Sequence, residues 1–299
     1  MSEVNIGIVT DSHSNGYDSQ IAEALRKDNL GCIAYLGDAP SDMRAHPQQH
    51  LNEIAQSLQT FDNIGVPVFW IPGNYEDFQA YRVAFQKLEE KLDNVIDVSS
   101  MDKSVPFKGF DFVFVPGSSV YTRGFHVTDQ AETGDYNTQN GQVHVFNPND
   151  LRKLVQNPDK TVVFAHHPCK IDGDYSIDLA IHANYNGQRY VGPYAHQLVK
   201  TGQGTPLQSH QGDEALTRIL REIGVQKFFS GDIHEAASIV DIDGNPIKEG
   251  QYSRQLFANP GPAKEGDYGI VKLRDDGTAS MVRHNVTGNK RDYLSELIR

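Results

Sequence analysis

Five short clusters of Asp, Asn, Glu and His stand out in this sequence, because each follows directly on a strand-like apolar run. Carboxylate oxygens, amide oxygens and imidazole nitrogens are the protein groups that hold divalent cations such as Mn²⁺, Mg²⁺, Fe²⁺ and Zn²⁺. In chain order the clusters are Asp11-Ser12-His13, Gly37-Asp38, Gly73-Asn74-Tyr75-Glu76, His166-His167-Pro168 and Gly231-Asp232-Ile233-His234. Together they predict a centre that binds metal ions.

Each cluster also has a simpler structural interpretation. An Asp or Asn after a strand commonly forms a turn or caps the next helix, because its side chain accepts from nearby backbone N–H groups. Asp38 and Asn74, each taken alone, are more often caps than ligands. The set as a whole favours a metal site, since the cap interpretation must hold at five separate places.

The elements that must position these clusters are strands alternating with helices. The apolar runs predict strands at residues 4–10, 32–36, 66–71, 161–165 and 226–230, and later near 257–273 and 280–284. Amphipathic patterns predict helices at 18–26, 48–60, 77–92, 150–156 and 212–223. This alternation is typical of βαβ units, in which ligands bind at the carboxyl ends of the strands. We therefore expect the five clusters to meet at one edge.

Composition limits the class of protein. The chain has 299 residues and a formal net charge of −12, which argues against broad, non-specific binding of nucleic acid. No apolar run is long enough to span a bilayer, and the N-terminus lacks the pattern of a signal peptide. With only two Cys, we expect a reduced, cytoplasmic protein without a membrane partner.

The ordered clusters resemble the motifs of the calcineurin-like metallophosphoesterases, which read D-x-H, G-D, G-N-H-[DE], H-x-P and G-H-x-H. Here they read DSH, GD, GNYE, HHP and GDIH, and an Asn259-Pro260-Gly261 turn follows as in many small members. The resemblance implies an α/β fold, a four-layer α/β/β/α sandwich of two mixed sheets that carries a di-metal site on its loops. It also makes residues 1–299 a single domain, because ligands far apart in the chain must meet.

The resemblance further implies roles for individual residues. One metal ion would be held by Asp11, His13, Asp38 and His234, and a second would share Asp38 and add Asn74 and His166. The motif positions also mark Asn74, Tyr75, Glu76 and His167 as catalytic candidates, with Asn74 and His167 contacting phosphate oxygens.

Two positions depart from the family pattern. Asp232 stands where relatives have a His ligand of the second metal, and a carboxylate there favours Mn²⁺, Mg²⁺ or Fe over Zn²⁺. The alternative is that Asp232 only caps a turn. Tyr75 replaces the His that assists the leaving group, and a phenol is a poor proton donor near neutral pH. Tyr75 could equally be a packing aromatic.

Two long polar stretches, 117–150 and 169–211, interrupt the pattern of strands and helices. Their lengths exceed ordinary connections, so we expect insertions that act as lids or substrate-binding loops. Arg123 and Arg189 within them are candidates to hold a phosphate or carboxylate group. Residues 289–298 predict a short terminal helix.

We therefore expect a metal-dependent hydrolase of phosphate esters with two divalent ions, most simply Mn²⁺, with Fe, Mg²⁺ or Zn²⁺ as alternatives. The loss of the motif His at Tyr75 favours phosphodiester or nucleotide substrates, whose leaving groups need little protonation. The alternatives are a phosphomonoesterase or protein phosphatase, and a non-catalytic binding module that kept the fold. The sequence does not specify the substrate, nor the oligomeric state.

Overall fold

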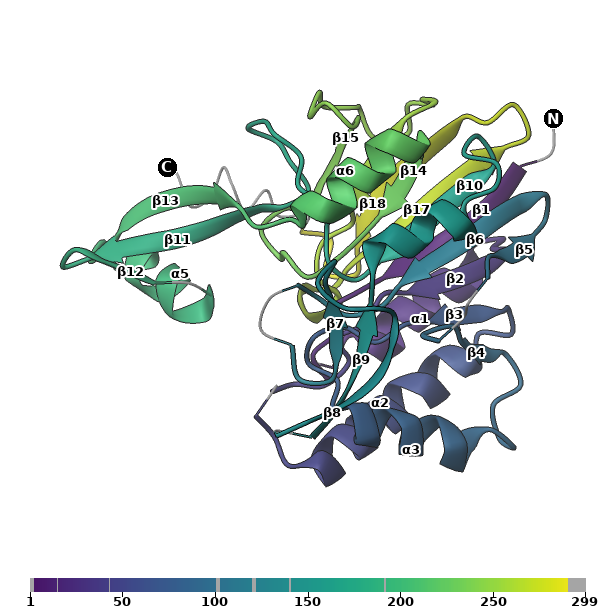
Figure 1. The fold of residues 1–299 in the computed structure, drawn as a ribbon, viewed down its shortest axis with the longest axis horizontal. Helices are drawn as coiled ribbons and strands as arrows, with labels where there is room; N and C mark the ends of the chain where they lie inside the picture. Colours follow the sequence, from purple (N-terminus) through teal and green to yellow (C-terminus); the bar gives the residue numbers. More distant parts are fainter. Residues whose placement is uncertain are drawn as a thin grey trace.

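Two six-stranded sheets form the body of the protein (Figure 1). The computed structural model describes residues 3–14, 16–42, 44–100, 103–119, 122–139, 141–190 and 192–289. The predicted helix at 289–298 falls almost wholly outside these ranges. In the first sheet the strand order is β18-β17-β1-β2-β3-β4, and in the second it is β15-β16-β14-β10-β6-β5.

The strands that carry the predicted clusters run parallel to one another within each sheet. In the first sheet β1 pairs with β2 and β2 with β3 in parallel, while β17 pairs antiparallel with β1. In the second sheet β10 pairs in parallel with β6 and β14, and β14 with β16, while the outer strands β5 and β15 pair antiparallel with β6 and β16. Both sheets are therefore mixed, and the carboxyl ends of their central strands lie at one edge.

The strands of the first sheet are β1 (Glu3–Val9), β2 (Cys32–Tyr35), β3 (Val68–Trp70), β4 (Val95–Asp97), β17 (Asp267–Arg274) and β18 (Ala279–Asn285). Those of the second sheet are β5 (Val105–Phe107), β6 (Phe110–Val115), β10 (Thr161–Ala165), β14 (Lys227–Phe229), β15 (Ser238–Val240) and β16 (Leu256–Asn259).

Side-chain alternation along the strands builds three buried layers. On β1 and β2 the residues Ile6, Ile8 and Ala34 point into a core between the two sheets, where they join Phe112 and Phe164 from the second sheet. The neighbouring residues of β2 point outward against the helices of the first sheet, and those of β10 point outward against the helices of the second. Successive side chains of a strand point to opposite faces of the sheet, so a sheet buried on both sides needs apolar residues at both alternating positions.

Helices cover the outer face of each sheet, as Figure 1 shows. Over the first sheet lie α1 (Asp18–Lys27), α2 (Pro47–Asp62) and α3 (Phe78–Leu88), and over the second lie α4 (Leu151–Leu154), preceded by the 3₁₀ turn η1 (Pro148–Asp150), and α6 (Glu214–Ile223). A further 3₁₀ turn, η2 (Ala263–Glu265), joins β16 to β17. The helix–sheet–sheet–helix order confirms the predicted fold class.

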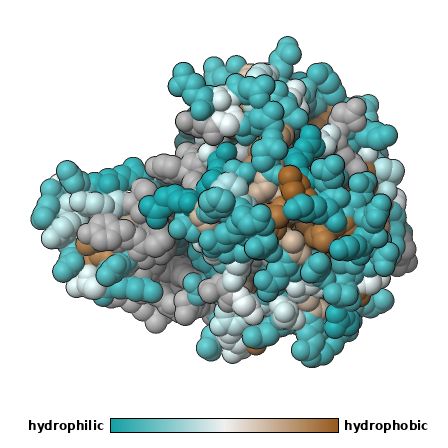
Figure 2. Space-filling view, turned by 90° about the horizontal axis from the view of Figure 1, so that it is seen from below, coloured by the Kyte–Doolittle hydropathy of each residue, from teal (hydrophilic) through white to brown (hydrophobic). Residues whose placement is uncertain are grey.

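The two long polar stretches contain small sheets of their own. The first forms β7 (Phe125–Val127), β8 (Gly134–Thr138) and β9 (Gly141–Phe146), in the order β7-β9-β8. The second forms β11 (Leu179–Tyr185), β12 (Gln188–Tyr190) and β13 (Thr205–His210), in the order β12-β11-β13, with α5 (Gly192–Lys200) beside them. We call this second unit the arm, because it stands out from the body in Figures 1 and 2.

The surface seen in Figure 2 is mostly hydrophilic, with one compact hydrophobic patch on the body. Within the described residues, no helix combines the length and the apolar character that crossing a bilayer requires.

Candidate metal centre

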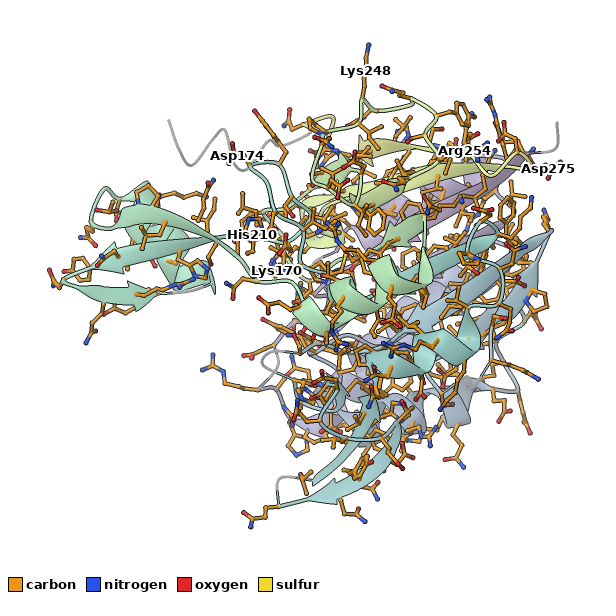
Figure 3. The ribbon with its side chains drawn as sticks, turned by 45° about the horizontal axis from the view of Figure 1, so that its top comes forward. Lys170, Asp174, His210, Lys248, Arg254 and Asp275 are labelled. Atoms are coloured by element: carbon orange, nitrogen blue, oxygen red, sulfur yellow. The ribbon has the colours of Figure 1, made fainter. Side chains whose placement is uncertain are left out.

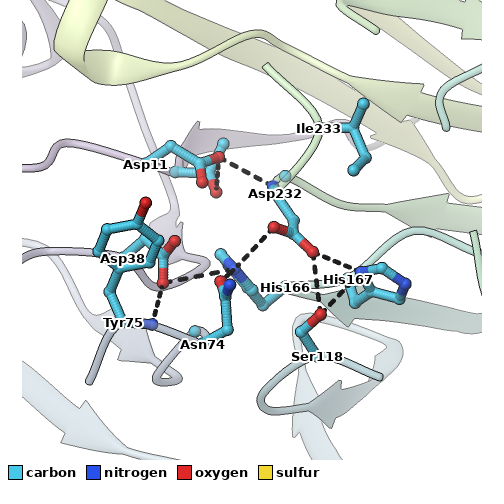
Figure 4. Close-up of polar contacts among 12 residues, drawn as sticks. Asp11, Asp38, Asn74, Tyr75, Ser118, His166, His167, Asp232 and Ile233 are labelled. Atoms are coloured by element: carbon cyan, nitrogen blue, oxygen red, sulfur yellow. Dashed lines mark hydrogen bonds and ion pairs between the residues drawn. The ribbon is translucent and has the colours of Figure 1, made fainter. Parts of the chain in front are cut away.

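The five predicted clusters meet where the central strands of both sheets end. Asp11, Asp38 and Asn74 follow β1, β2 and β3 of the first sheet, while His166 and Asp232 follow β10 and β14 of the second (Figure 4). The Nε2 atom of His166 lies 3.5 Å from Oδ1 of Asp38 and 3.8 Å from Oδ1 of Asp232. The site is thus built across the junction of the two sheets.

The helix-cap interpretation fails for these residues. Helices α2 and α3 begin at Pro47 and Phe78, and their N-cap side chains are those of His46 and Asp77. The carboxylate of Asp38 instead accepts a hydrogen bond from the backbone N–H of Tyr75, at 2.8 Å. Asp38 therefore joins two strand-end loops rather than starting a helix.

The backbone at three of the carboxylates adopts a conformation that most residues avoid. Asp11, Asp38 and Asp232 have φ angles of 57°, 58° and 64°, in the left-handed region. Such angles are strained for residues other than Gly, although Asp tolerates them better than most, and they concentrate at functional sites. Each strained turn directs a carboxylate toward the same small volume.

Gly73 is needed for the close approach of these loops. A Cβ atom at this position would lie 2.2 Å from Oδ1 of Asp38 and 2.6 Å from the ring of His166. Any larger residue would push the carboxylate and the imidazole apart, so the Gly of the GNYE cluster has a steric role.

The first group of candidate ligands surrounds Nε2 of His166. The side-chain amide of Asn74 lies 2.8 Å from this nitrogen, with its NH₂ group directed at His166 and at the carboxylate of Asp38, and Oδ1 of Asp38 lies 3.5 Å from the same nitrogen. Burial opposes charge here, yet the carboxylates of Asp38, Asp232 and Asp11 raise the pKa of His166 well above its usual value. The surroundings therefore stabilise positive charge, which is the property a cation site requires.

The second group consists of Asp11, His13 and His234. Ligand atoms of these three residues all lie within 4.8 Å of one another, as do those of Asp11, Asp38 and His166. The Oδ1 atom of Asp11 is buried, makes no hydrogen bond within the described residues, and lies 3.4 Å from Nε2 of His234. Because a buried carboxylate oxygen without a hydrogen bond is costly, a bound cation would stabilise it. Asp11 belongs to both groups.

In His13 and His166 the Nδ1–H group, which faces away from the site, donates to a backbone carbonyl oxygen, as is usual for metal-binding histidines. The Nδ1–H of His13 donates to the carbonyl oxygen of Pro40 at 3.1 Å, and that of His166 donates to Leu36 at 2.6 Å. Each bond fixes the ring and turns Nε2 toward the site. Burial lowers the pKa of His13 to about 4, so this imidazole is neutral near pH 7 and can offer a lone pair.

Asp232 is fixed by two neighbouring side chains. Its Oδ2 contacts Nδ1 of His167 and accepts from the hydroxyl of Ser118 at 3.1 Å, which leaves Oδ1 facing His166 (Figure 4). Although burial opposes it, the interaction with His167 lowers the pKa of Asp232. Asp232 is thus presented as a charged carboxylate with one oxygen directed at the site. The donors present fit two cations.

Tyr75 lies beside the second group rather than in a distant core. Its ring meets the ring of His13 edge-to-face, with 4.6 Å between centroids. The side chain is partly exposed, and burial together with the charge of Asp38 raises its pKa to about 12. The phenol therefore keeps its proton near neutral pH and can only donate a hydrogen bond.

Glu76 lies beneath the loops, with no exposed surface. Its carboxylate accepts from the backbone N–H groups of Asp38, Ala39 and Gly73, at 3.2, 2.9 and 2.8 Å. Burial and the charge of Asp38 raise the pKa of Glu76, while the N–H groups oppose this rise. The side chain ties the loop after β2 to the loop after β3.

The sequence analysis missed two residues that the fold brings to the site. Ser118 lies beyond the end of β6, so the rule that located the other clusters also applies to it. Lys264, in η2, lies with Nζ 2.6 Å from Nδ1 of His234. No local pattern marks this lysine, because its approach depends on backbone bonds from η2 to Thr10 and Asp11.

The two arginines considered for substrate binding make structural contacts. Arg123 donates to the carboxylate of Asp77 at 3.2 Å and to the carbonyl oxygen of Ala45 at 3.1 Å, which ties the first insertion to the body. Arg189 donates to Ser209 at 2.6 Å within the arm.

Comparison with known proteins agrees with this geometry. The family model for the calcineurin-like phosphoesterases matches residues 4–236, most of the chain. The chain belongs to this family. It is thus a metallophosphoesterase, a hydrolase that acts on phosphoric ester bonds, and the resemblance inferred from its motifs is confirmed.

Comparison with solved structures finds similar chains at low sequence identity. The protein TT1561 of Thermus thermophilus superposes with a TM-score of 0.58 at 11% identity, over 95% of this chain and 100% of the other. A dimetal phosphatase from Danio rerio gives a TM-score of 0.47 at 13% identity, over 95% of this chain and 99% of the other. No protein among those with curated functions matches the sequence.

Proposed function

We propose that this phosphoesterase hydrolyses phosphate esters at a dinuclear centre, with a preference for phosphodiester or nucleotide substrates. The proposed ligands are Asp11, His13, Asp38, Asn74, His166, Asp232 and His234. The observation that carries this proposal is the convergence of carboxylate oxygens from both sheets, those of Asp38 and Asp232, on Nε2 of His166. Because the ligands come from both sheets, we also propose that residues 1–299 form one domain.

Two divalent cations would supply Lewis-acid chemistry here, by lowering the pKa of a water and offsetting charge on phosphate oxygens. The carboxylate in place of an imidazole at Asp232 favours Mn²⁺, Mg²⁺ or Fe²⁺ over Zn²⁺. Asp38 would be a ligand shared by the two ions, because its carboxylate lies 3.9 Å from Nε2 of His13 and 3.5 Å from Nε2 of His166.

The protein's own groups then have distinct tasks. Asn74 orients phosphate through its amide, and Tyr75 donates a hydrogen bond to a substrate oxygen. Glu76 and His167 are positioning residues, since Glu76 holds the loops and His167 holds Asp232. Because Tyr75 stands where a His would donate a proton, the site suits leaving groups that are stable as anions. This supports phosphodiesters of phenols or nucleotides as substrates.

The test is a screen of metal-supplemented protein against an aryl phosphate monoester and the matching bis-aryl diester. We expect two metal ions per chain, and a higher kcat/KM for the diester. A higher value for the monoester would overturn the diester preference and favour a phosphomonoesterase. Fewer than one ion per chain, with no turnover, would overturn the enzyme assignment at this site and favour a binding module.

A further inference from the structure

A second cavity lies at the opposite ends of the strands that carry the candidate metal centre. Lys160 directly precedes β10 and Lys227 begins β14, whereas His166 and Asp232 follow the other ends of these two strands. The cavity has a volume of about 370 Å³, and Arg254 and Asp275 also line it. Figure 3 shows Arg254 and Asp275 at the end of the body away from the arm.

The lysines that line this cavity lie deeper than its carboxylates. Lys227 is 1% exposed, and Lys160 is half-buried beneath the rim. The carboxylates that line the cavity belong to exposed residues, namely Asp159, Asp275 and Asp276. The floor is therefore cationic, whereas the rim is acidic on balance, with three aspartates and the exposed Arg254, in a protein whose net charge is −12.

The cationic groups have few partners within the described chain. An ammonium group has three N–H donors, but the one hydrogen bond that Lys227 makes to a described residue goes to the carbonyl oxygen of Asp159, at 2.9 Å. Lys160 donates to the carbonyl oxygen of Asp275 at 2.6 Å, and its ammonium lies 5.2 Å from the ring centroid of Phe110. Arg254 makes no hydrogen bond or ion pair with any described residue. The cavity thus presents donors without matching acceptors.

Burial makes the charge on Lys227 costly, because it lowers the pKa of the ammonium to about 8. A buried cation is normally compensated by an anion. The exposed aspartates stand at the rim, and one of them, Asp276, already accepts two hydrogen bonds from Thr278. An acceptor that enters the cavity would meet the unused donors directly.

We propose that this cavity is a second ligand site, separate from the metal centre, that binds a phosphate group carried by a small molecule. Lys227 and Lys160 contact the phosphate at the floor, and the forked guanidinium of Arg254 closes over it. The volume falls within the range of small-molecule sites, about 300–1,000 Å³, so the ligand is no larger than a mononucleotide. The acidic rim disfavours further negative charge, so a monophosphate binds better than a diphosphate or triphosphate.

The experiment measures binding of inorganic phosphate, AMP and ATP by calorimetry to the full-length Asp38→Asn variant, so that the metal centre contributes little. We expect saturable binding of phosphate and AMP, and weaker binding of ATP. Adding Lys227→Met should lower the affinity for AMP at least tenfold. Lys248→Met removes an exposed lysine elsewhere (Figure 3) and should leave this affinity unchanged.

Arg254→Ala alters an exposed side chain and keeps the test valid if Lys227→Met fails to fold. It should lower the affinity for AMP severalfold. The proposal is overturned if the parent variant binds neither phosphate nor AMP, if ATP binds as well as AMP, or if Arg254→Ala changes nothing. None of these results depends on hydrolysis, so this experiment tests the second site independently of the function proposed for the metal centre.

Discussion

Nε2 of His166 lies 3.5 Å from Oδ1 of Asp38, although the two residues follow strands of different sheets. This contact joins the two halves of the sandwich at the carboxyl ends of β2 and β10. Both side chains are almost completely buried, at 0% and 1% exposure, so each is an expensive group to leave without a counter-charge.

Asp38→Asn should remove bound metal and hydrolysis together, because the proposed shared ligand loses its charge. We expect kcat/KM to fall by more than about 100-fold, since even outer-shell changes cost about 10–100-fold. Metal content by elemental analysis and initial rates check this. Asp174→Asn, at an exposed carboxylate, is the matched control and should behave as wild type. Wild-type turnover by Asp38→Asn would contradict the assignment.

Glu76→Gln should destabilise the fold, because a side-chain amide cannot accept from all three backbone N–H groups that the carboxylate satisfies. A loss of about 2 kcal/mol in the free energy of unfolding is expected for unsatisfied buried donors. Urea unfolding measures it. Glu53→Gln is a suitable comparison, since Glu53 also accepts from a backbone N–H but is only partly buried, and it should change stability little. Equal effects of the two substitutions on the free energy of unfolding would argue against the role of Glu76 in joining the two loops.

Tyr75→His should restore an acid beside the leaving group. We expect it to raise kcat/KM for an alkyl phosphate monoester relative to an aryl diester by about tenfold, within the range known for general acid catalysis. Tyr75→Phe serves as the control that removes only the hydroxyl, and it should leave that ratio nearly unchanged. If the ratio is the same in Tyr75→His and wild type, the residue does not determine the ester preference.

Lys264→Met should tighten metal binding by Asp11, His13 and His234. The lysine ammonium lies 2.6 Å from Nδ1 of His234, where metal-binding histidines usually face an acceptor. Removing this positive charge should increase the affinity for Mn²⁺ by about tenfold. Competition with a chelating dye reports the affinity without reference to activity, and Lys248→Met controls for net charge. Weaker binding by Lys264→Met would show that the lysine supports the site instead.

Stability should rise with pH in the range set by Lys227. Its pKa is about 8 in the folded protein, against an ordinary 10.5, so between these values the unfolded chain binds more protons. The contribution of Lys227 to the free energy of unfolding is therefore largest above pH 10.5. It decreases as the pH falls from 10.5 and is lost once the pH has fallen through 8. Relative to Lys227→Met, wild type should gain about 3 kcal/mol across this range, because a difference of one pKa unit corresponds to about 1.4 kcal/mol. Unfolding curves at several pH values measure the difference, and a difference independent of pH would refute the prediction.

Much of the frame follows from local sequence pattern. The apolar run at 161–165 predicts β10 residue for residue, and the predicted helices at 18–26 and 212–223 differ from α1 and α6 by one or two residues at an end. Such segments have a clear period and flanking Gly or Asp residues, so their boundaries are set locally. The secondary structure of the two insertions is harder to predict, because segments rich in Gly, Asn and Gln show no clear hydrophobic periodicity. Their strands β8 and β13 are largely exposed and depend on cross-strand pairing.

The sequence by itself determined which residue types follow each strand, and hence the donor set and the family. Only the tertiary structure decided how they act. It placed Glu76 under the loops, set Asp232 against His167 and Ser118, and brought Lys264 to His234. The physical reason is that a strand end can be recognised from neighbouring residues, whereas the distance between two strand ends depends on how the two sheets pack. That packing is fixed by the buried layer between the sheets, to which many distant segments contribute at once.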